Sequence, residues 1–376
     1  MKKSCYRRTE KLGFFGLLCV FSLMFQSHLV WGKGSSADSG RKSTSGESVF
    51  SRTHQTKSLF AVSPVNFDYF SSGPGVDFSL MKYGSQEHIE KFADKLVSLI
   101  YRDHGEDLSS HPDDWVIVSP AYLRLPTSAA LLTESVGNRF KARFGVTLKN
   151  VSLKRRTTNS IDFGSLQNIS QRESHIKGNF YYEGPDLKGK KLLFIEDALV
   201  SGTHYIESQR ALTQVAGVSH EHIFGYFLVN VEQAGAENPD FSLEAAINHM
   251  YIPKDNPEIL KNLMLNKSNK VTPRVLKYIF SSSDFTGYFC EQLPYRPLSK
   301  IYAASLLDGF DQLEPFRGMV ARIKSCTEEK LRELKQEEAV HSLVQVNEKN
   351  FAALHEKNIS HDKFSGPVSL SSCIPC

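Results

Sequence analysis

Cysteine, charge of one sign and long apolar runs are all scarce in this sequence, and each scarcity narrows what the protein can be. None of the six cysteines of the 376-residue chain falls between residues 20 and 289, so the middle of the chain needs no disulfide. The formal net charge is only +4, which argues against a dedicated nucleic-acid binder. The apolar run at residues 13–25 is short for a membrane span. The composition, with 40% hydrophobic and 23% charged residues, is instead that of a globular protein.

The first 32 residues have the pattern of a targeting segment. Basic residues precede the apolar run, which Gln26, Ser27 and His28 interrupt. This pattern is typical of a signal peptide cleaved near Gly32, and it predicts an exported protein. Two alternatives stay open: an uncleaved membrane anchor, or a start codon placed too far upstream on a cytoplasmic protein. The basic residues are Lys2, Lys3, Arg7, Arg8 and Lys11.

Composition divides the remaining chain into four parts. Ser, Thr, Gly and Lys dominate residues 33–58, which cannot bury enough apolar surface to fold and are interpreted as a linker. An α/β domain is predicted for 59–232, a mostly helical accessory region for 233–345 and a tail for 346–376. The later part of the chain holds four cysteines that can pair in an oxidising compartment or stay free, namely Cys290, Cys326, Cys373 and Cys376.

Strand-like and helix-like patterns alternate in the α/β domain. Short apolar runs predict buried strands, and apolar residues at helical spacing predict the helices between them. Such alternation implies a parallel sheet with helices on both faces, whose ligands bind at the carboxyl ends of the strands. Thr127 or Ser128 is expected to cap the second helix and Gly217 to end the third. We expect strands at 115–119, 146–153, 176–182, 192–196 and 222–231, and helices at 88–102, 127–144, 204–216, 256–265, 273–280, 298–310 and 328–344.

The most informative segment follows the strand at 192–196. That strand ends in two adjacent carboxylates, Glu196 and Asp197, and a short loop with Ser, Gly and Thr leads into a helix. A helix N-terminus after such a loop favours a phosphate, and carboxylates accept hydrogen bonds from sugar hydroxyls. The pattern therefore predicts a sugar-phosphate site; the alternative is a buried strand followed by a helix capped by Ser201 or Thr203. Its substrate-binding residues would be Ala198, Leu199, Val200, Ser201, Gly202, Thr203 and His204.

This segment resembles the signature of the type I phosphoribosyltransferases, in particular bacterial members of unassigned substrate. The signature has a hydrophobic strand, two acidic residues, two or three apolar residues, Thr or Ser, then Gly and small residues. Thr203 and His204 depart from it, because another small residue and then Thr or Ser usually follow the glycine. The resemblance covers residues 78–231 and implies phosphoribosyl pyrophosphate as ligand, with Mg²⁺ bridging its oxygens.

Two further segments take roles from the resemblance. The loop after the first core strand would bind pyrophosphate through charge pairing with Arg124 and through backbone N–H groups, with Ala121 and Tyr122 as further candidates. Arg155 and Arg156 begin a polar segment that would close over the substrate and bring cations to the leaving group. For each arginine a solvated surface position is the alternative interpretation.

The resemblance implies transfer of a phosphoribosyl group to an acceptor, with loss of pyrophosphate. Glu196 and Asp197 would hold the ribose hydroxyls, stabilise positive charge on the ring, and contact Mg²⁺ through ribose or water. The residues do not identify the acceptor. Two other functions stay open: a non-catalytic sensor of a sugar phosphate or nucleotide, and an exported interaction protein that keeps the fold for packing. Expected partners are small molecules and a second copy in a homodimer, with no nucleic acid and no membrane contact beyond the N-terminal segment.

Overall fold

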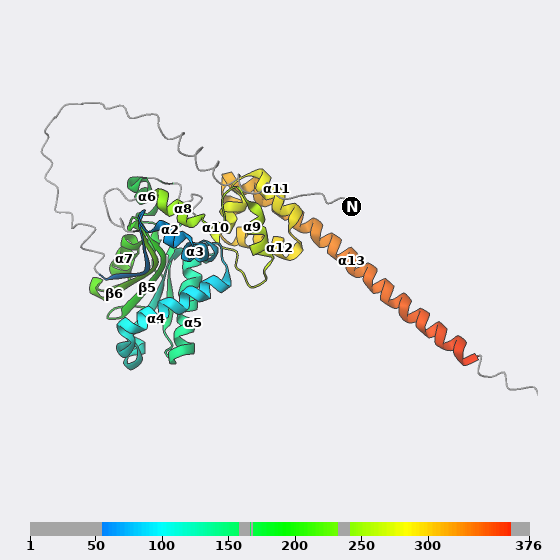
Figure 1. The fold of residues 1–376 in the computed structure, drawn as a ribbon, viewed down its shortest axis with the longest axis horizontal. Coiled ribbons are helices and arrows are strands. Elements are labelled where there is room, and N and C mark those ends of the chain that lie inside the picture. The colour runs from blue at the N-terminus through cyan, green and yellow to red at the C-terminus, as the bar shows by residue number, and fades with distance from the viewer. Residues whose placement is uncertain (1–54, 158–165, 167, 232–240, 362–376) are drawn as a thin grey trace, which may run out of the picture. The chain divides into compact units, whose positions relative to one another are not determined.

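The computed structural model describes residues 55–157, 166, 168–231 and 241–361, with side chains up to residue 350. Its described strands form one sheet in the order β1-β6-β5-β2-β3-β4 (Figure 1). Every pairing is parallel except that of β4 with β3. This confirms the predicted α/β fold with a mostly parallel sheet. The strands are β1 (Thr56–Val62), β2 (Trp115–Tyr122), β3 (Lys149–Arg155), β4 (Phe180–Tyr181), β5 (Lys191–Leu199) and β6 (Ile223–Val231).

The central strand β5 is covered on both faces, as the sequence predicts. Successive side chains of a strand point to opposite faces. Leu193 and Ile195 therefore pack in one core with α4 (Gln86–Ser110) and α5 (Ser128–Phe144). Leu192 and Phe194 pack in another core with α7 (Thr203–Ala216). The same alternation carries on to Glu196 and Asp197, and it sends these two carboxylates in opposite directions.

Two helices begin or end at the capping residues that the sequence predicts. The Thr127 hydroxyl accepts a hydrogen bond from the Ala130 N–H at 3.2 Å and so caps α5, as expected. Gly217 ends α7 with a left-handed φ of 68°, a conformation that glycine adopts without steric cost. Thr127 thus ends the loop between β2 and α5, and Gly217 begins the segment between α7 and β6.

The C-terminal part is helical, as predicted, and it has its own apolar core. Phe280, Phe289 and Phe310 lie in this core together with Tyr83 and Leu125 of the sheet domain. The shared core holds the helical region against the loop that follows β2. Outside the sheet the helices are α2 (Phe67–Ser71), α3 (Pro74–Lys82), α6 (Ile169–Ile176), α8 (Phe241–Asn248), α9 (Pro257–Leu265), α10 (Pro273–Ile279), α11 (Ser283–Gln292), α12 (Tyr295–Leu307) and α13 (Glu314–His361).

A disulfide joins Cys290 of α11 to Cys326 of α13, a pairing that the sequence left open. Their Cα atoms lie 5.6 Å apart, within the range that a disulfide spans. The bond closes a loop across a sequence separation of 36 residues. On the chain-entropy account, a loop of this size stabilises the fold by about 4 kcal/mol.

Three elements differ from their predicted form. β1 begins at Thr56, before the expected start of the domain. The prediction missed this start because Thr, Lys and Ser of the strand resemble the preceding linker. The strand nevertheless pairs with β6. The strand expected at 176–182 is only Phe180–Tyr181, because Asn168 caps α6 and Gly178 adopts a φ of 75°. The helix expected at 328–344 is part of α13, whose sequence has neither Gly nor Pro from 319 to 361. None of the described helices is both long and apolar enough to cross a membrane.

Candidate functional site

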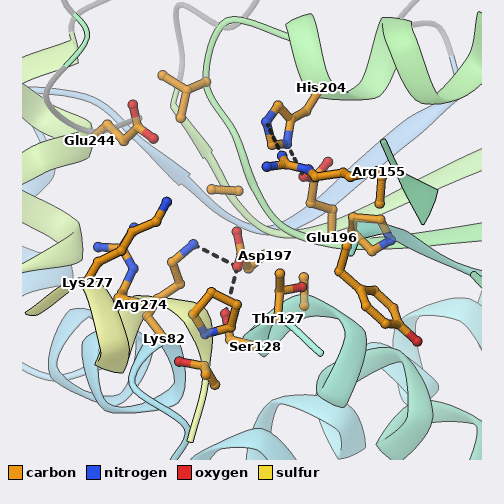
Figure 2. A pocket seen from close by; sticks show the side chains of 18 of the residues that line it. Lys82, Thr127, Ser128, Arg155, Glu196, Asp197, His204, Glu244, Arg274 and Lys277 are labelled. Carbon is orange, nitrogen blue, oxygen red and sulfur yellow. Dashed lines mark hydrogen bonds and ion pairs between the residues drawn. The ribbon is translucent and has the colours of Figure 1, made fainter. Parts of the chain in front are cut away.

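A cavity of about 370 Å³ opens where β2 and β5 end, which is within the size range of small-ligand sites. The loops after these two strands line it, together with the end of β3. Lys82 at the end of α3 and Arg274 and Lys277 of α10 complete the wall from outside the sheet (Figure 2). The cavity thus lies where a parallel sheet places its ligands.

Asp197 lies on the α5 face of β5 and is bound by two donors. The Lys82 ammonium approaches its Oδ2 at 2.7 Å, and the Ser128 hydroxyl donates to the same oxygen at 3.1 Å. Burial alone would raise the pKa of Asp197, but the charge and hydrogen bond of Lys82, with Arg274 and Ser128, lower it below its ordinary value. Asp197 is therefore a stable carboxylate at neutral pH, held in one orientation.

Glu196 lies on the opposite face and contacts His204. Arg155 Nη2 is 3.3 Å from His204 Nε2, and His204 Nδ1 is 3.2 Å from Glu196 Oε1. Because a guanidinium only donates, Nε2 accepts, so the neutral ring carries its proton on Nδ1 and donates it to Glu196. Burial lowers the pKa of Arg155 to about 10, although the charges of Glu196 and Asp308 act to raise it. Arg155 therefore stays charged at neutral pH.

One oxygen of Glu196 has no hydrogen bond. The residue is 5% exposed, and its Oε2 atom is buried and finds no partner among the described residues. A buried acceptor without a donor costs about 1–3 kcal/mol. Glu196 lines the cavity, so a hydroxyl donor of a bound ligand could satisfy this oxygen.

The loop between β5 and α7 has the form of an anion site. Gly202 adopts a left-handed φ of 75° and precedes the helix without a side-chain cap. The Ser201 and Thr203 hydroxyls lie 2.9 Å apart and bond to each other. The first turn of α7 faces the loop with the positive end of the helix dipole, which favours a phosphate. The expectation that Ser201 or Thr203 caps the helix is not met, because Gly202 occupies the cap position.

Comparison with known proteins finds distant relatives over part of the chain. No family model matches the chain. The orotate phosphoribosyltransferase of Listeria monocytogenes serotype 4b (strain F2365) is 26% identical over 188 residues, which cover 43% of this chain and 88% of the relative. The enzyme of the same name from serovar 1/2a (strain EGD-e) is 26% identical over 185 residues, covering 42% and 87%. The chain is a distant relative of the phosphoribosyltransferases. The relationship supports phosphoribosyl transfer at the level of the family.

The cavity of the present chain brings together most of the residues expected from its sequence. Thr203, the first residue of α7, is not part of the cavity lining. The side chain of Arg124 is exposed. Its backbone N–H donates a hydrogen bond to Asp308. Arg156 is also exposed, with its guanidinium over the Tyr181 ring rather than in the cavity. Those that line the cavity are Ala121, Tyr122, Arg155, Glu196, Asp197, Ala198, Leu199, Val200, Ser201, Gly202 and His204.

Several residues that line the cavity could not be identified from the sequence pattern. Lys82 lies 115 residues before Asp197, and a single lysine at a helix end is normally a solvated surface residue. Arg172 is 4% exposed and pairs with Glu244 of α8 at 2.6 Å, a partner 72 residues away. Only the fold brings these pairs together. The other unforeseen charged residues of the lining are Lys254, Arg274, Lys277 and Asp308.

Proposed function

We propose that this protein binds phosphoribosyl pyrophosphate with Mg²⁺ and transfers the phosphoribosyl group to an acceptor, with pyrophosphate as the leaving group. The observation that carries the proposal is the buried, unsatisfied oxygen of Glu196, beside a second carboxylate and next to the Gly202 loop. A ligand that donates hydroxyls and carries a phosphate a few ångströms away fits both parts. A ribose phosphate is such a ligand.

The chain's own residues would act mainly by position and charge. In the reaction the bond from ribose C1 to a pyrophosphate oxygen breaks, its electron pair leaves with pyrophosphate, and an acceptor lone pair forms the new bond to C1. Glu196 and Asp197 place fixed negative charge near the ring as positive charge develops on it. Ser201 and Gly202, at the start of α7, would hold the 5-phosphate and so fix the distance of C1 from the acceptor.

Mg²⁺ fits the oxygen chemistry of this cavity. The ion prefers oxygen ligands, keeps several waters and commonly binds substrate phosphates with one or two carboxylates. Glu196 and Asp197 are the carboxylates nearest the proposed sugar, and they would hold the ion indirectly, through ribose oxygens or water. Bound Mg²⁺ would neutralise charge on the leaving pyrophosphate.

Calorimetric titration with phosphoribosyl pyrophosphate and Mg²⁺ tests the proposal. We expect the wild-type protein to bind, and the Glu196→Gln/Asp197→Asn double variant to bind at least about 100-fold more weakly, because two charge-assisted hydrogen-bonding sites are lost. Asp113→Asn/Asp114→Asn is the matched control, because this exposed acidic pair lies at the opposite end of the sheet, before β2. A folded wild-type protein that does not bind would contradict the proposal.

A non-catalytic sensor of the same ligand is the second candidate. Two observations favour it. His204 stands where the family signature usually has Thr or Ser, and Asp308 already accepts hydrogen bonds from the N–H groups of Arg124 and Leu125 in the loop expected to bind pyrophosphate. Pyrophosphate release with orotate, the acceptor in the relatives' names, separates the two candidates. Turnover supports the enzyme, and binding without release over a panel of acceptors supports the sensor.

We further propose that the protein is exported. The Cys290–Cys326 disulfide supports this, because disulfides persist in oxidising compartments, as does the N-terminal pattern. Phosphoribosyl pyrophosphate is by contrast a cytosolic metabolite, so location bears directly on the choice between enzyme and sensor. Protein taken from its own cells with thiols trapped at lysis should show Cys290 and Cys326 fully protected from alkylation. Full labelling of both would contradict export.

A further inference from the structure

The helical region contributes cations to the cavity from the side opposite the phosphate loop. Arg274 and Lys277 lie one turn apart on α10 and line the cavity, as does Lys82. Figure 2 shows these three across the cavity from Arg155 and His204, with Asp197 between the two groups. Arg274 and Asp197 both line the cavity. Burial raises the pKa of Asp197, and the charges of Lys82 and Arg274 lower it.

The loop after β2 is already occupied by a carboxylate. Asp308, which follows α12, accepts hydrogen bonds from the backbone N–H of Leu125 at 3.0 Å and of Arg124 at 3.2 Å. Two successive N–H groups directed at one oxygen form the usual backbone site for an anion. An oxyanion of a ligand would have to displace Asp308 to use them. A second oxyanion therefore needs donors elsewhere in the cavity.

The charged side chains of the cavity are compatible with a second oxyanion. Six Lys or Arg side chains line it, against four Asp or Glu side chains. Arg172 pairs with Glu244 and Lys82 with Asp197, and the charges of Lys277 and Arg155 act on Asp308. Even so, the cations of the lining outnumber its carboxylates by two. The lining as a whole stays positive, and α10 supplies two of its cations. A site with net positive charge favours an anionic ligand.

We propose that Arg274 and Lys277 form a second oxyanion subsite of this cavity. Its ligand is a phosphoryl or carboxylate group other than the 5-phosphate: the pyrophosphate of the sugar ligand, or an acidic group of the acceptor. The proposal rests on the proposed function in one respect, that the 5-phosphate lies at the Gly202 loop. It makes α10 part of the binding site and gives the helical region a role that the sequence left open.

Four ligands and two variants test this subsite by calorimetry. The variant is Arg274→Gln/Lys277→Gln. Its matched control is Arg296→Gln/Lys300→Gln, an exposed Arg and Lys on one face of α12. The ligands are ribose 5-phosphate, phosphoribosyl pyrophosphate with Mg²⁺, inorganic pyrophosphate, and orotate. We expect ribose 5-phosphate to bind wild type and both variants equally, while a ligand with the second oxyanion binds the α10 variant about 10- to 100-fold more weakly.

The pattern of losses identifies the source of the oxyanion. Weaker binding of both pyrophosphate ligands, with orotate unchanged, assigns the subsite to pyrophosphate. Weaker binding of orotate alone assigns it to an acidic acceptor. Unchanged binding of all four ligands by the α10 variant, or no binding of any by wild type, overturns the subsite. If wild type binds inorganic pyrophosphate through these side chains but not ribose 5-phosphate, the subsite stands and the sugar-phosphate assignment fails.

Discussion

Replacing Lys82 with methionine is expected to lower the free energy of unfolding at pH 7 by about 3 kcal/mol, because it removes the cation that is hydrogen-bonded to the buried Asp197 carboxylate. Both side chains of the pair are only 12% exposed, so water replaces little of the lost interaction. Methionine keeps most of the volume of the lysine stem, which limits the effect of packing. Denaturant titration of the variant measures the loss directly.

Two further variants show whether charge burial causes this loss. Lys91→Met removes a lysine that also pairs at 2.6 Å with an aspartate, Asp77, but Lys91 is 49% exposed. It should cost at most about 1 kcal/mol. The double variant Lys82→Met/Asp197→Asn should recover part of the stability, since no unpaired charge then remains. If the double variant is no more stable than Lys82→Met, packing rather than charge explains the loss.

The pH dependence of the wild type follows from the same pair. The folded-state pKa of Asp197 lies below its ordinary value. Its stabilising contribution is therefore complete above the unfolded pKa of about 3.9 and is lost as pH falls through the folded pKa. Lys82→Met removes the largest influence that lowers this pKa, so the folded-state pKa of Asp197 should be higher in the variant than in wild type. The stability difference between variant and wild type should thus be largest at neutral pH and shrink towards acid.

The fold of the sheet domain could be predicted from sequence because its strands are buried on both faces. The run Leu192–Ile195 and the strand at 223–231 are apolar at nearly every position, as central parallel strands are. β1 could not be predicted in this way. It is an edge strand, its burial is mixed, and only its pairing with β6 distinguishes it from the polar linker.

The site was predictable where its residues are consecutive and not where they come from distant segments. Glu196 and Asp197 are adjacent in sequence, so the motif predicts both, although strand alternation gives them different partners. Arg155 and Arg156 are equally basic, and only the backbone of β3 decides which of them reaches the cavity. Arg274 and Lys277 belong to a helix whose charges look like a solvated face until α10 is placed against the sheet domain.

Replacing Arg155 with methionine is expected to weaken binding of ribose 5-phosphate by about 10- to 100-fold. Arg155 donates to His204 Nε2 and its charge interacts with that of Glu196, so it acts as a positioning residue for that carboxylate. Without the donor, the His204 ring is no longer held with its proton on Nδ1. Glu196 then loses both a fixed hydrogen bond and a neighbouring cation, and it holds a sugar hydroxyl less well.

Two measurements separate this positioning role from a general loss of stability. Nitrogen NMR of the His204 ring should show the Nδ1–H tautomer in wild type and a mixture with Nε2–H in Arg155→Met. Arg156→Met is the matched control: Arg156 is adjacent, exposed and over the Tyr181 ring, so binding and tautomer should stay as in wild type. An unchanged tautomer with weakened binding would instead mean that Arg155 contacts the ligand itself. Weakened binding in the Arg156 variant alone would move the cationic role to the segment after β3.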